Sequence, residues 1–517
     1  MPATVARKPN RRGRSKADDG LALPPITPGM TGGHYRPLTT AEMERIHELV
    51  LQLLADLGLS QVTPSLQARA VAAGCEVDGD GRLRFPRALV EDVIARTRRK
   101  FTLHGVDPKH DIEIGGRRVH AGTGGAAPTI MDFHSGKYRE STVADLYDIA
   151  RLVDRMDNIH WYHRSVVARD TETVLDLDIN TTYACLSGTS KSIAVSYTDS
   201  ASVKAVLPML DAVAGGEGKF RERPFCTAVC CHVVPPMRFA TESCEALEAA
   251  VEAGMPILLV AAGQAGATAP AALAGAVAQA CAEVLAGLIL CNIIDPDCRG
   301  IFATWPFVSD LRTGAMSGGS GEQALLSAAC AQMAGFYDLP GSVPAGMTDS
   351  KLPDMQAGGE KGYTISLAAH AGASMIHESA GMHGSLMGTS FESYVLDNDL
   401  LGAILRTVRG VEVNEDTVNF EVIRDVVLGE GHFLGHPQTY NRMKTDYLYP
   451  EIADRRSISE WEDAGGHDAR EVARTKVQHI LADHYPNHVT PETDRWLRDT
   501  YNITLPASRM RAGNGVW

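Results

Sequence analysis

Several features that would place this chain in a well-known class are scarce or missing. Cysteine is scarce, with 10 in 517 residues, which is too few for a disulfide-stapled scaffold. Basic side chains do not dominate, because 49 Lys and Arg face 63 Asp and Glu for a net charge of −14. That balance argues against nucleic-acid binding as the main role. The basic N-terminal residues are followed by no apolar run, so a secretory signal is not expected. We expect a cytoplasmic protein with reduced thiols.

Long membrane-spanning runs are also missing, although one stretch imitates them. No charged residue occurs between Glu252 and Glu283. Pro256, Gly263 and Pro270 interrupt this stretch, and its apolar pieces fall far short of the ~20 residues that a span requires. The pattern predicts a strand, a loop and a buried helix, and no contact with a membrane.

What the chain does contain is a middle region of alternating elements. Short apolar runs occur near residues 118–123, 158–168, 191–197, 225–234, 256–262, 299–305, 341–347 and 373–379. Amphipathic or Ala-rich stretches separate most of them. Eight strand–helix alternations with near-continuously apolar strands predict an α/β fold, a (β/α)8 TIM barrel. A doubly wound open sheet is the alternative.

The sequence also predicts the structure of the regions on either side of the barrel. Residues 1–35 are expected to form a disordered basic tail and residues 36–115 a helical N-terminal cap, whose first helix begins with a Thr39–Glu42 capping box. The barrel is placed at 116–400 and a helical C-terminal region at 401–517.

Glycine-rich and histidine motifs give weak signals. Gly122–Ala127 resembles a dinucleotide fingerprint, but Pro128 follows where a helix should begin, so we interpret it as a tight turn. A hairpin turn is expected over Met131–Lys137. The sequence has no Walker A motif and no nucleophile elbow. His432 and His436 have helical metal-pair spacing, but the glycines around them favour a loop.

The densest group of soft metal ligands is Cys230, Cys231 and His232. Adjacent strand residues point to opposite faces, so Cys230 and Cys231 cannot both enter one site without a bend. Buried packing is the favoured interpretation, and we expect no metal.

In a barrel, function is expected where strands end and loops begin. Asp349 and His377 are the catalytic candidates at such positions, and an apolar run also ends at Glu378. Aromatic residues around one cavity would bind a quaternary ammonium through cation–π contacts, with a nearby carboxylate adding charge complementarity. The proposed substrate-binding residues are Phe133, Tyr197, Trp305, Gln356 and Glu378.

Three motifs carry a family resemblance. These are Thr348-Asp-Ser-Lys-Leu-Pro-Asp-Met-Gln-Ala-Gly with Glu360-Lys361, Ala373-Ser-Met-Ile-His377, and Gly431-His-Phe-Leu-Gly-His-Pro437. Through them, residues 36–500 resemble the trimethylamine methyltransferase family of corrinoid-dependent methyltransferases. The resemblance implies a (β/α)8 barrel and transfer of a methyl group from a methylated amine to a Co(I) corrinoid.

The resemblance also implies the reaction partners. No cofactor is expected to bind tightly, since cob(I)alamin would be supplied by a separate corrinoid protein, toward which Gly346, Thr348 and His432 would face. Founding members contain pyrrolysine, and this chain has only the twenty standard residues. It is therefore similar to the non-pyrrolysine branch, which demethylates quaternary amines such as glycine betaine, proline betaine or carnitine. A betaine carboxylate would need a basic partner, for which Arg164, Lys351 and Lys361 are candidates. We expect a homo-oligomer.

Three other functions remain open at this point. A zinc-dependent methyltransferase acting on a thiol or alcohol would use Cys230, Cys231 or His232 as ligands. A non-catalytic betaine-binding barrel would sense or buffer an osmolyte. A barrel lyase would use Lys351 as a Schiff base.

Overall fold

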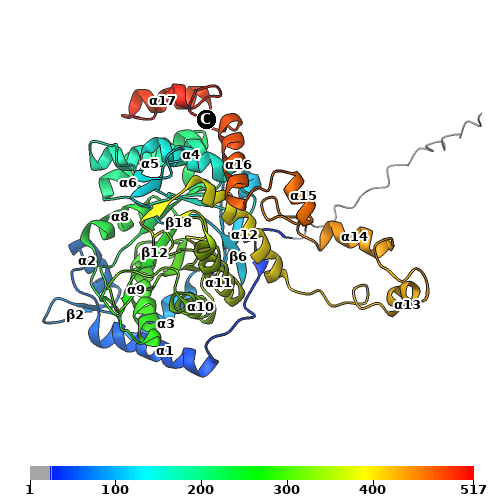
Figure 1. Cartoon of the computed structure of the whole chain (residues 1–517). Helices are drawn as coiled ribbons and strands as arrows, with labels where there is room; N and C mark the ends of the chain where they lie inside the picture. The colour runs from blue at the N-terminus through cyan, green and yellow to red at the C-terminus, as the bar shows by residue number, and fades with distance from the viewer. Residues whose placement is uncertain (1–23, 25) are drawn as a thin grey trace, which may run out of the picture. The chain divides into compact units, whose positions relative to one another are not determined.

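A computed structural model describes Pro24 and residues 26–517, so most of the predicted disordered tail lies outside the described residues. The chain divides into two compact units. One contains Pro28–Gly410 and Pro450–Trp517, and the other contains Val411–Tyr449 among its described residues. The larger unit is an α/β barrel with additions at both ends (Figure 1).

Eight parallel strands form the barrel, and each lies within one of the predicted apolar runs. They are β6 (Arg118–Ala121), β9 (Tyr162–His163), β10 (Ile193–Val195), β11 (Cys226–Cys230), β12 (Ile257–Ala261), β14 (Gly300–Thr304), β16 (Gly341–Pro344) and β17 (Met375–His377). Within a nine-stranded sheet these parallel strands follow the order β6-β17-β16-β14-β12-β11-β10-β9. A parallel bridge between Gly122 and Trp161 joins the last strand to the first. The ring is therefore closed, which confirms the predicted barrel and excludes the open sheet.

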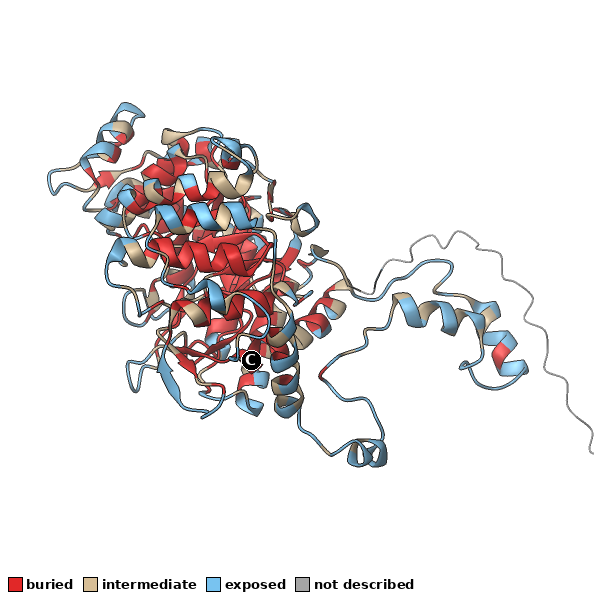
Figure 2. Ribbon diagram, turned by 90° about the horizontal axis from the view of Figure 1, so that it is seen from above, coloured by how far each residue is buried: buried red, intermediate tan, exposed pale blue. Residues whose placement is uncertain are grey.

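Helices surround this ring. They are α4 (Val143–Asp154), α5 (Val174–Gly188), α6 (Ser200–Ala214), α7 (Lys219–Glu222), α8 (Thr241–Glu252), α9 (Leu273–Ile294), α10 (Gly321–Phe336), α11 (Met355–Ala371) and α12 (Phe391–Arg409). Their inward faces are buried, as the red ribbon in Figure 2 shows. Helix α5 was not predicted, because its sequence is rich in polar residues such as Asp178 and Asn180 that the fold nevertheless buries.

Helix α9 accounts for the charge-free stretch. It is the one helix among the described residues that is long and apolar enough to cross a membrane, and 89% of its most apolar window is buried inside the protein. The predicted order of strand, loop and buried helix is therefore confirmed by β12 and α9.

The N-terminal segment covers the amino end of the barrel. It contains β1 (Met30–Thr31), α1 (Thr40–Gln52), the π-helical turn η1 (Leu53–Leu57), α2 (Pro64–Ala72), β2 (Glu76–Val77), β3 (Leu83–Arg84), α3 (Arg87–Arg96), β4 (Phe101–Leu103), η2 (Pro108–His110) and β5 (Ile112–Ile114). The Thr39–Glu42 capping box is present. The β4–β5 hairpin inserts Phe101, Leu103, Ile112 and Ile114 into the barrel core and closes that end.

Short strands lie at the opposite end of the barrel. Strands β7 (Thr129–Met131), β8 (Tyr138–Glu140), β18 (Met382–His383) and β19 (Gly388–Thr389) form one small sheet, while β13 (Gln264–Ala265) pairs with β15 (Phe307–Val308). The β7–β8 pair confirms the predicted hairpin. Because Gly122–Ala127 leads into β7 and not into a helix, the nucleotide interpretation of that motif is excluded.

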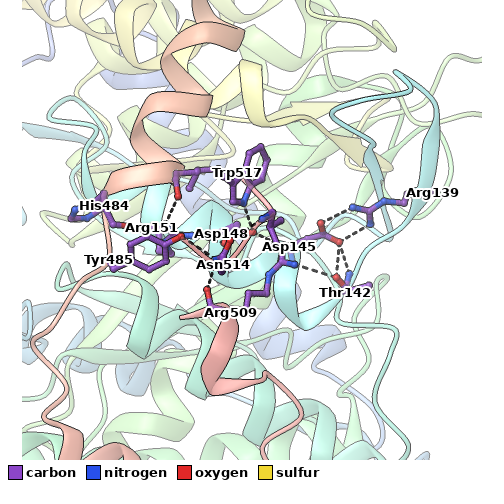
Figure 3. Close-up of polar contacts among 12 residues, drawn as sticks. Arg139, Thr142, Asp145, Asp148, Arg151, His484, Tyr485, Arg509, Asn514 and Trp517 are labelled. Carbon is purple, nitrogen blue, oxygen red and sulfur yellow. Dashed lines mark hydrogen bonds and ion pairs between the residues drawn. The ribbon is translucent and has the colours of Figure 1, made fainter. Parts of the chain in front are cut away.

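The chain ends in α15 (Ile458–Asp463), α16 (Ala469–Asp483), α17 (Pro491–Thr500) and η3 (Ala507–Arg509). Four residues, Asp148, Arg151, Arg509 and Trp517, tie the C-terminus to α4 and are called the C-terminal anchor below (Figure 3). Asp148 accepts hydrogen bonds from Arg151 at 2.7 Å, Arg509 at 2.6 Å and the Trp517 indole at 2.9 Å. Arg151, which is fully buried, also donates to the carbonyls of Leu481 and His484.

The smaller unit, Val411–Tyr449, contains α13 (Phe420–Leu428) and α14 (Pro437–Thr445). His432 lies in the loop between them and is not helical, as predicted. Many apolar side chains of the smaller unit are exposed, including Val411, Phe420, Val427 and Leu434.

Candidate functional site

The carboxyl ends of the eight strands meet at one end of the barrel, where the loops that follow them form its mouth. The inward direction at each strand follows from alternation along the strand. Trp161, directly before β9, belongs to the barrel core, so His163 of β9 points inward as well and Tyr162 points outward. The Tyr162 hydroxyl confirms this direction, because it donates to the Leu146 carbonyl of α4.

Four aromatic rings gather inside the mouth. The ring centroid of His377 lies 4.0 Å from that of Trp161, 4.7 Å from that of Trp305 and 5.7 Å from that of His163. Trp161 is placed there by Gly122, where a Cβ atom would lie 2.0 Å from the indole. The structure therefore brings together Trp305 and His377, two of the residues proposed from the sequence.

A hydrogen-bond chain orients His377. The Trp305 indole N–H donates to Ser342 Oγ at 3.2 Å, and Ser342 Oγ lies 2.7 Å from His377 Nδ1. Burial lowers the pKa of His377 well below its usual value, so the ring is neutral at pH 7. With Ser342 donating to Nδ1, the ring proton lies on Nε2, a buried atom that has no partner among the described residues.

Glu378 is the most unusual residue of the mouth. Its side chain is fully buried, and both carboxylate oxygens are without a hydrogen-bond partner among the described residues. The carboxylate lies against the loop after β6, where a Cβ atom on Gly124 would be 3.0 Å from Oε1 and one on Gly125 would be 2.7 Å from Oε2. Its backbone has φ = 62°, a strained conformation for a non-glycine residue.

Burial is also the cause of Glu378's altered ionisation. It raises the pKa of the carboxyl to about 8, so the group is mostly protonated at pH 7. A buried carboxyl without a partner is costly unless it stays neutral or meets a cation. Strain and an unpaired acid at a strand end together make Glu378 a candidate functional residue.

Asp349 has a different environment. Ser317 Oγ donates to it at 2.7 Å and Gly318 N–H at 2.9 Å, and the Ser385 hydroxyl donates as well. It lies at the wall of a cavity of about 640 Å³ whose lining includes Asp310, Met316, Lys351 and Leu386. Met316 and Leu386 pack against the barrel core, so this cavity adjoins the mouth. Through these hydrogen bonds, Asp349 connects the loop before α10, which contains Ser317 and Gly318, to the loop after β18, which contains Ser385.

The motif that begins at Thr348 is held by Glu360. Thr348 Oγ1 donates to Glu360 Oε2 at 2.5 Å, and Gln356 Nε2 donates to Oε1 at 2.9 Å. Gln356 is exposed in the first turn of α11. Gly346 has φ = 106° and fits closely against Ser379, where a Cβ atom would lie 2.6 Å from Cα, so packing requires glycine there.

Two predicted aromatic residues lie away from the four rings. Phe133 packs against Phe391 and Trp517, with the Arg474 guanidinium 4.1 Å from its ring centroid. The Tyr197 hydroxyl lies 3.5 Å from Cys226 Sγ. Val229 of β11 faces the barrel core, so Cys226 faces the helix layer, and Tyr197 reaches toward that layer. His432 belongs to the smaller unit.

The proposed zinc ligands of the alternative function do not converge. Cys230 is buried on the helix side, His232 Nε2 is 2.9 Å from the Glu283 carbonyl, and Cys231 is exposed. Within the described part of the chain, no group of three His, Cys, Asp or Glu side chains is arranged to hold a metal ion. Lys351, the lysine of the lyase alternative, is exposed and donates to the Asp349 carbonyl at 2.5 Å.

Trp161 is a mouth residue that the sequence analysis did not propose, whereas His163 stood among the strand-end candidates. The signal was present, because Trp161 and His163 lie two residues apart and therefore share a face. The sequence did not show which residues of this strand face into the barrel. An error of one residue along the strand exchanges the inward-facing side chains for the outward-facing ones.

Known proteins provide an independent comparison. The family model described as trimethylamine methyltransferase (MTTB) matches residues 5–503. Trimethylamine methyltransferase MttB of Methanosarcina barkeri (strain Fusaro / DSM 804) is 30% identical over 94% of this chain and 97% of its own length. Glycine betaine methyltransferase of Desulfitobacterium hafniense (strain Y51) is 29% identical over 90% and 96%.

Solved structures agree on the fold. The crystal structure of the Methanosarcina barkeri monomethylamine methyltransferase (MtmB) superimposes with a TM-score of 0.50 at 10% identity, covering 86% of this chain and 88% of that one. With a family match over nearly the whole length and a closed α/β barrel, the chain is a methyltransferase that belongs to the trimethylamine methyltransferase family.

Proposed function

We propose that this protein transfers a methyl group from a quaternary amine, of the glycine betaine, proline betaine or carnitine type, to the Co(I) corrinoid of a separate protein. The observation that carries the proposal is Glu378, a fully buried carboxyl without a partner that directly follows His377 of the four-ring cluster. The printed names of the relatives, which include a trimethylamine and a glycine betaine methyltransferase, support a methylated amine as the donor.

The mouth suits a permanent cation. A quaternary ammonium has no N–H to donate, so hydrogen-bond acceptors do not select it, whereas ring faces and a carboxylate do. Trp161 and Trp305 supply the ring faces and Glu378 supplies the countercharge. When the cation arrives, Glu378 loses its proton and the buried charge becomes compensated.

Methyl transfer from such a substrate requires little acid–base chemistry. The leaving group is a neutral tertiary amine, since the N–C bond breaks with its electron pair remaining on nitrogen. The partner's Co(I) corrinoid supplies the electron pair that forms the new bond to carbon. This chain's residues position one N-methyl group toward the opening and exclude water from the ammonium. His377, fixed by Ser342, is proposed to keep the two indoles in place.

A comparison of charged and neutral isosteres tests the proposal. Glycine betaine and 3,3-dimethylbutanoate have the same shape and carboxylate, but only the first carries a positive nitrogen. We expect glycine betaine to raise the melting temperature and its carbon isostere to leave it unchanged, because only a cation compensates Glu378. Demethylation is then measured with a corrinoid protein and cob(I)alamin. Equal stabilisation by both compounds would contradict the cation site, and binding without demethylation would favour the betaine-binding barrel.

A further inference from the structure

The side chains proposed to meet the ligand are closed off from solvent. Trp161 is 1% exposed and Trp305 is 6% exposed, while His377 and Glu378 are fully buried. A ligand therefore cannot reach these side chains unless a segment that covers them moves. That segment must lie at the carboxyl end of the barrel, because the β4–β5 hairpin closes the amino end.

Two apolar side chains separate the barrel core from solvent at the carboxyl end. Met316, in the loop before α10, and Leu386, in the loop between β18 and β19, both pack against the core cluster. Trp161 and Trp305 belong to this cluster. Met316 and Leu386 also line the cavity of about 640 Å³, which reaches solvent because its lining includes the exposed Met387. A side chain that lines an open cavity and packs against the core stands between the two.

The loop that contains Leu386 has a strained backbone. The β18–β19 hairpin turns over residues 384–387, where the Met387 N–H donates to the Gly384 carbonyl at 3.2 Å. The two central residues, Ser385 and Leu386, have φ of 51° and 76°. A hairpin turn of this kind favours Asn-Gly, because a β-carbon disfavours positive φ. A Ser-Leu pair persists there only if contacts outside the turn hold it in place.

Asp349 provides such contacts to both covering loops. Its carboxylate accepts the Ser385 hydroxyl from the β18–β19 loop. It also accepts the Ser317 hydroxyl at 2.7 Å and the Gly318 N–H at 2.9 Å, from the residues that directly follow Met316. Hydrogen bonds to a carboxylate are stronger than those between neutral groups. One carboxylate thus ties the two loops together.

We propose that Asp349 is a positioning residue that latches a gate, formed by Met316 and Leu386, over the aromatic rings of the mouth. When the latch breaks, the strained turn relaxes, Leu386 leaves the core and a ligand passes from the cavity to the rings. Closure afterwards excludes water from the bound ligand. This inference rests on the proposed function for the identity of the ligand and goes beyond it by stating how the ligand enters. Asp349 then acts through the two loops and does not touch the reacting atoms.

A thiol placed beneath the gate measures its opening without any ligand. Met347 is a fully buried core residue, and a Cβ atom on Gly318 would lie 2.8 Å from its Cβ. In a Met347→Cys background, Asp349→Ala should raise the labelling rate of the introduced thiol at least about tenfold, because the latch loses hydrogen bonds to a carboxylate. Mass spectrometry of the labelled peptide measures this thiol alone. Asp310→Ala is the matched control and should leave the rate unchanged, since Asp310 lines the same cavity but accepts from Arg312 of its own loop.

Binding kinetics distinguish a gate from a general loosening of the site. A ligand must wait for the open state both to enter and to leave. Asp349→Ala should therefore raise the association and dissociation rate constants of tetramethylammonium together, each at least about tenfold, as stopped-flow tryptophan fluorescence measures. Leu386→Gly should do the same, because it removes the covering side chain and permits the positive φ. Damage to the rings would raise the dissociation rate constant alone.

Two results would overturn the gate. One is an unchanged labelling rate of the introduced thiol in both Asp349→Ala and Leu386→Gly, and the other is a dissociation rate constant that rises without the association rate constant. If Asp349→Ala fails to fold, Leu386→Gly provides both measurements by itself. If tetramethylammonium does not bind the wild type, the proposed function fails, and the labelling rate still decides whether the gate exists.

Discussion

The barrel mouth and the C-terminal anchor both bury an acidic side chain, but only the acid of the anchor is paired with basic groups. In the anchor, Asp148 is neutralised by Arg151 and Arg509 and also accepts the Trp517 indole N–H (Figure 3). At the mouth, the Glu378 carboxyl has no hydrogen-bond partner among the described residues. Both regions lie inside the same unit, so the difference is not one of general burial.

The comparison separates structural charge from functional charge. Paired buried ions hold elements together, and removing one partner destabilises the fold. An unpaired buried ionisable group costs stability when it is charged, which makes it a candidate for pairing with a ligand. Substitutions in the anchor should therefore change stability, and substitutions at the mouth should change binding.

The largest effect is expected at the anchor. Asp148→Ala leaves Arg151 buried without its countercharge, which should lower the free energy of unfolding by about 3–5 kcal/mol. Urea unfolding measures this change, and ligand affinity below the unfolding range should stay at the wild-type value. If Asp148→Ala lost as much ligand affinity as the variants at the mouth, the anchor would not differ from the mouth in its role, and the prediction would be wrong.

The next effect is expected at Glu378. Glu378→Gln keeps the shape but removes the negative charge, so the affinity for a quaternary ammonium should fall by about 100-fold. Its melting temperature should not fall, because the wild-type group is already mostly neutral at pH 7. Glu283→Gln is the control, since Glu283 is a buried carboxyl whose pKa burial likewise raises, to about 7, but which accepts the Met237 N–H outside the mouth. If Glu378→Gln lowered the melting temperature, Glu378 would have a structural role like that of the anchor residues, and the prediction would be wrong.

A smaller effect should appear in the pH dependence of stability. The pKa of Glu378 is about 8 in the folded protein, above its ordinary value of 4.5, so the folded state holds its proton more strongly than the unfolded state does. Its contribution is therefore fully present below pH 4.5 and is lost as pH rises to 8. Without ligand, the wild type should lose about 1.4 kcal/mol per pH unit in that window relative to Glu378→Gln. Parallel stability curves for the two proteins would contradict the raised pKa.

The smallest effect is expected from the ring faces. Trp305→Leu removes one cation–π partner and should reduce quaternary ammonium affinity by about 0.5–2 kcal/mol, whereas Trp305→Phe should retain part of it. Calorimetry with tetramethylammonium measures both variants. If both substitutions weakened binding equally, the volume of the side chain at this position would matter and the aromatic ring face would not.

The barrel fold could be predicted from the sequence better than the arrangement of side chains in the candidate site. Near-continuous apolar runs such as Ile257–Ala261 identify strands buried on both faces, and all eight strands were located from them. Helix α5 was missed because tertiary burial overrides the polarity of residues such as Asn180. At the site, Trp305, His377 and Glu378 follow from strand ends, but Phe133 depends on the Trp517 contact, which no local pattern reveals.

Proton release on ligand binding tests the central claim most directly. If the cation ionises Glu378, binding at pH 7 must release about 0.9 proton per site, the fraction protonated for a pKa of about 8. Calorimetric titration of glycine betaine in buffers of different ionisation enthalpy measures this number. We predict close to one proton at pH 7, almost none at pH 9.5, and none at either pH for Glu378→Gln. Binding without proton release at pH 7 in the wild type would contradict the account.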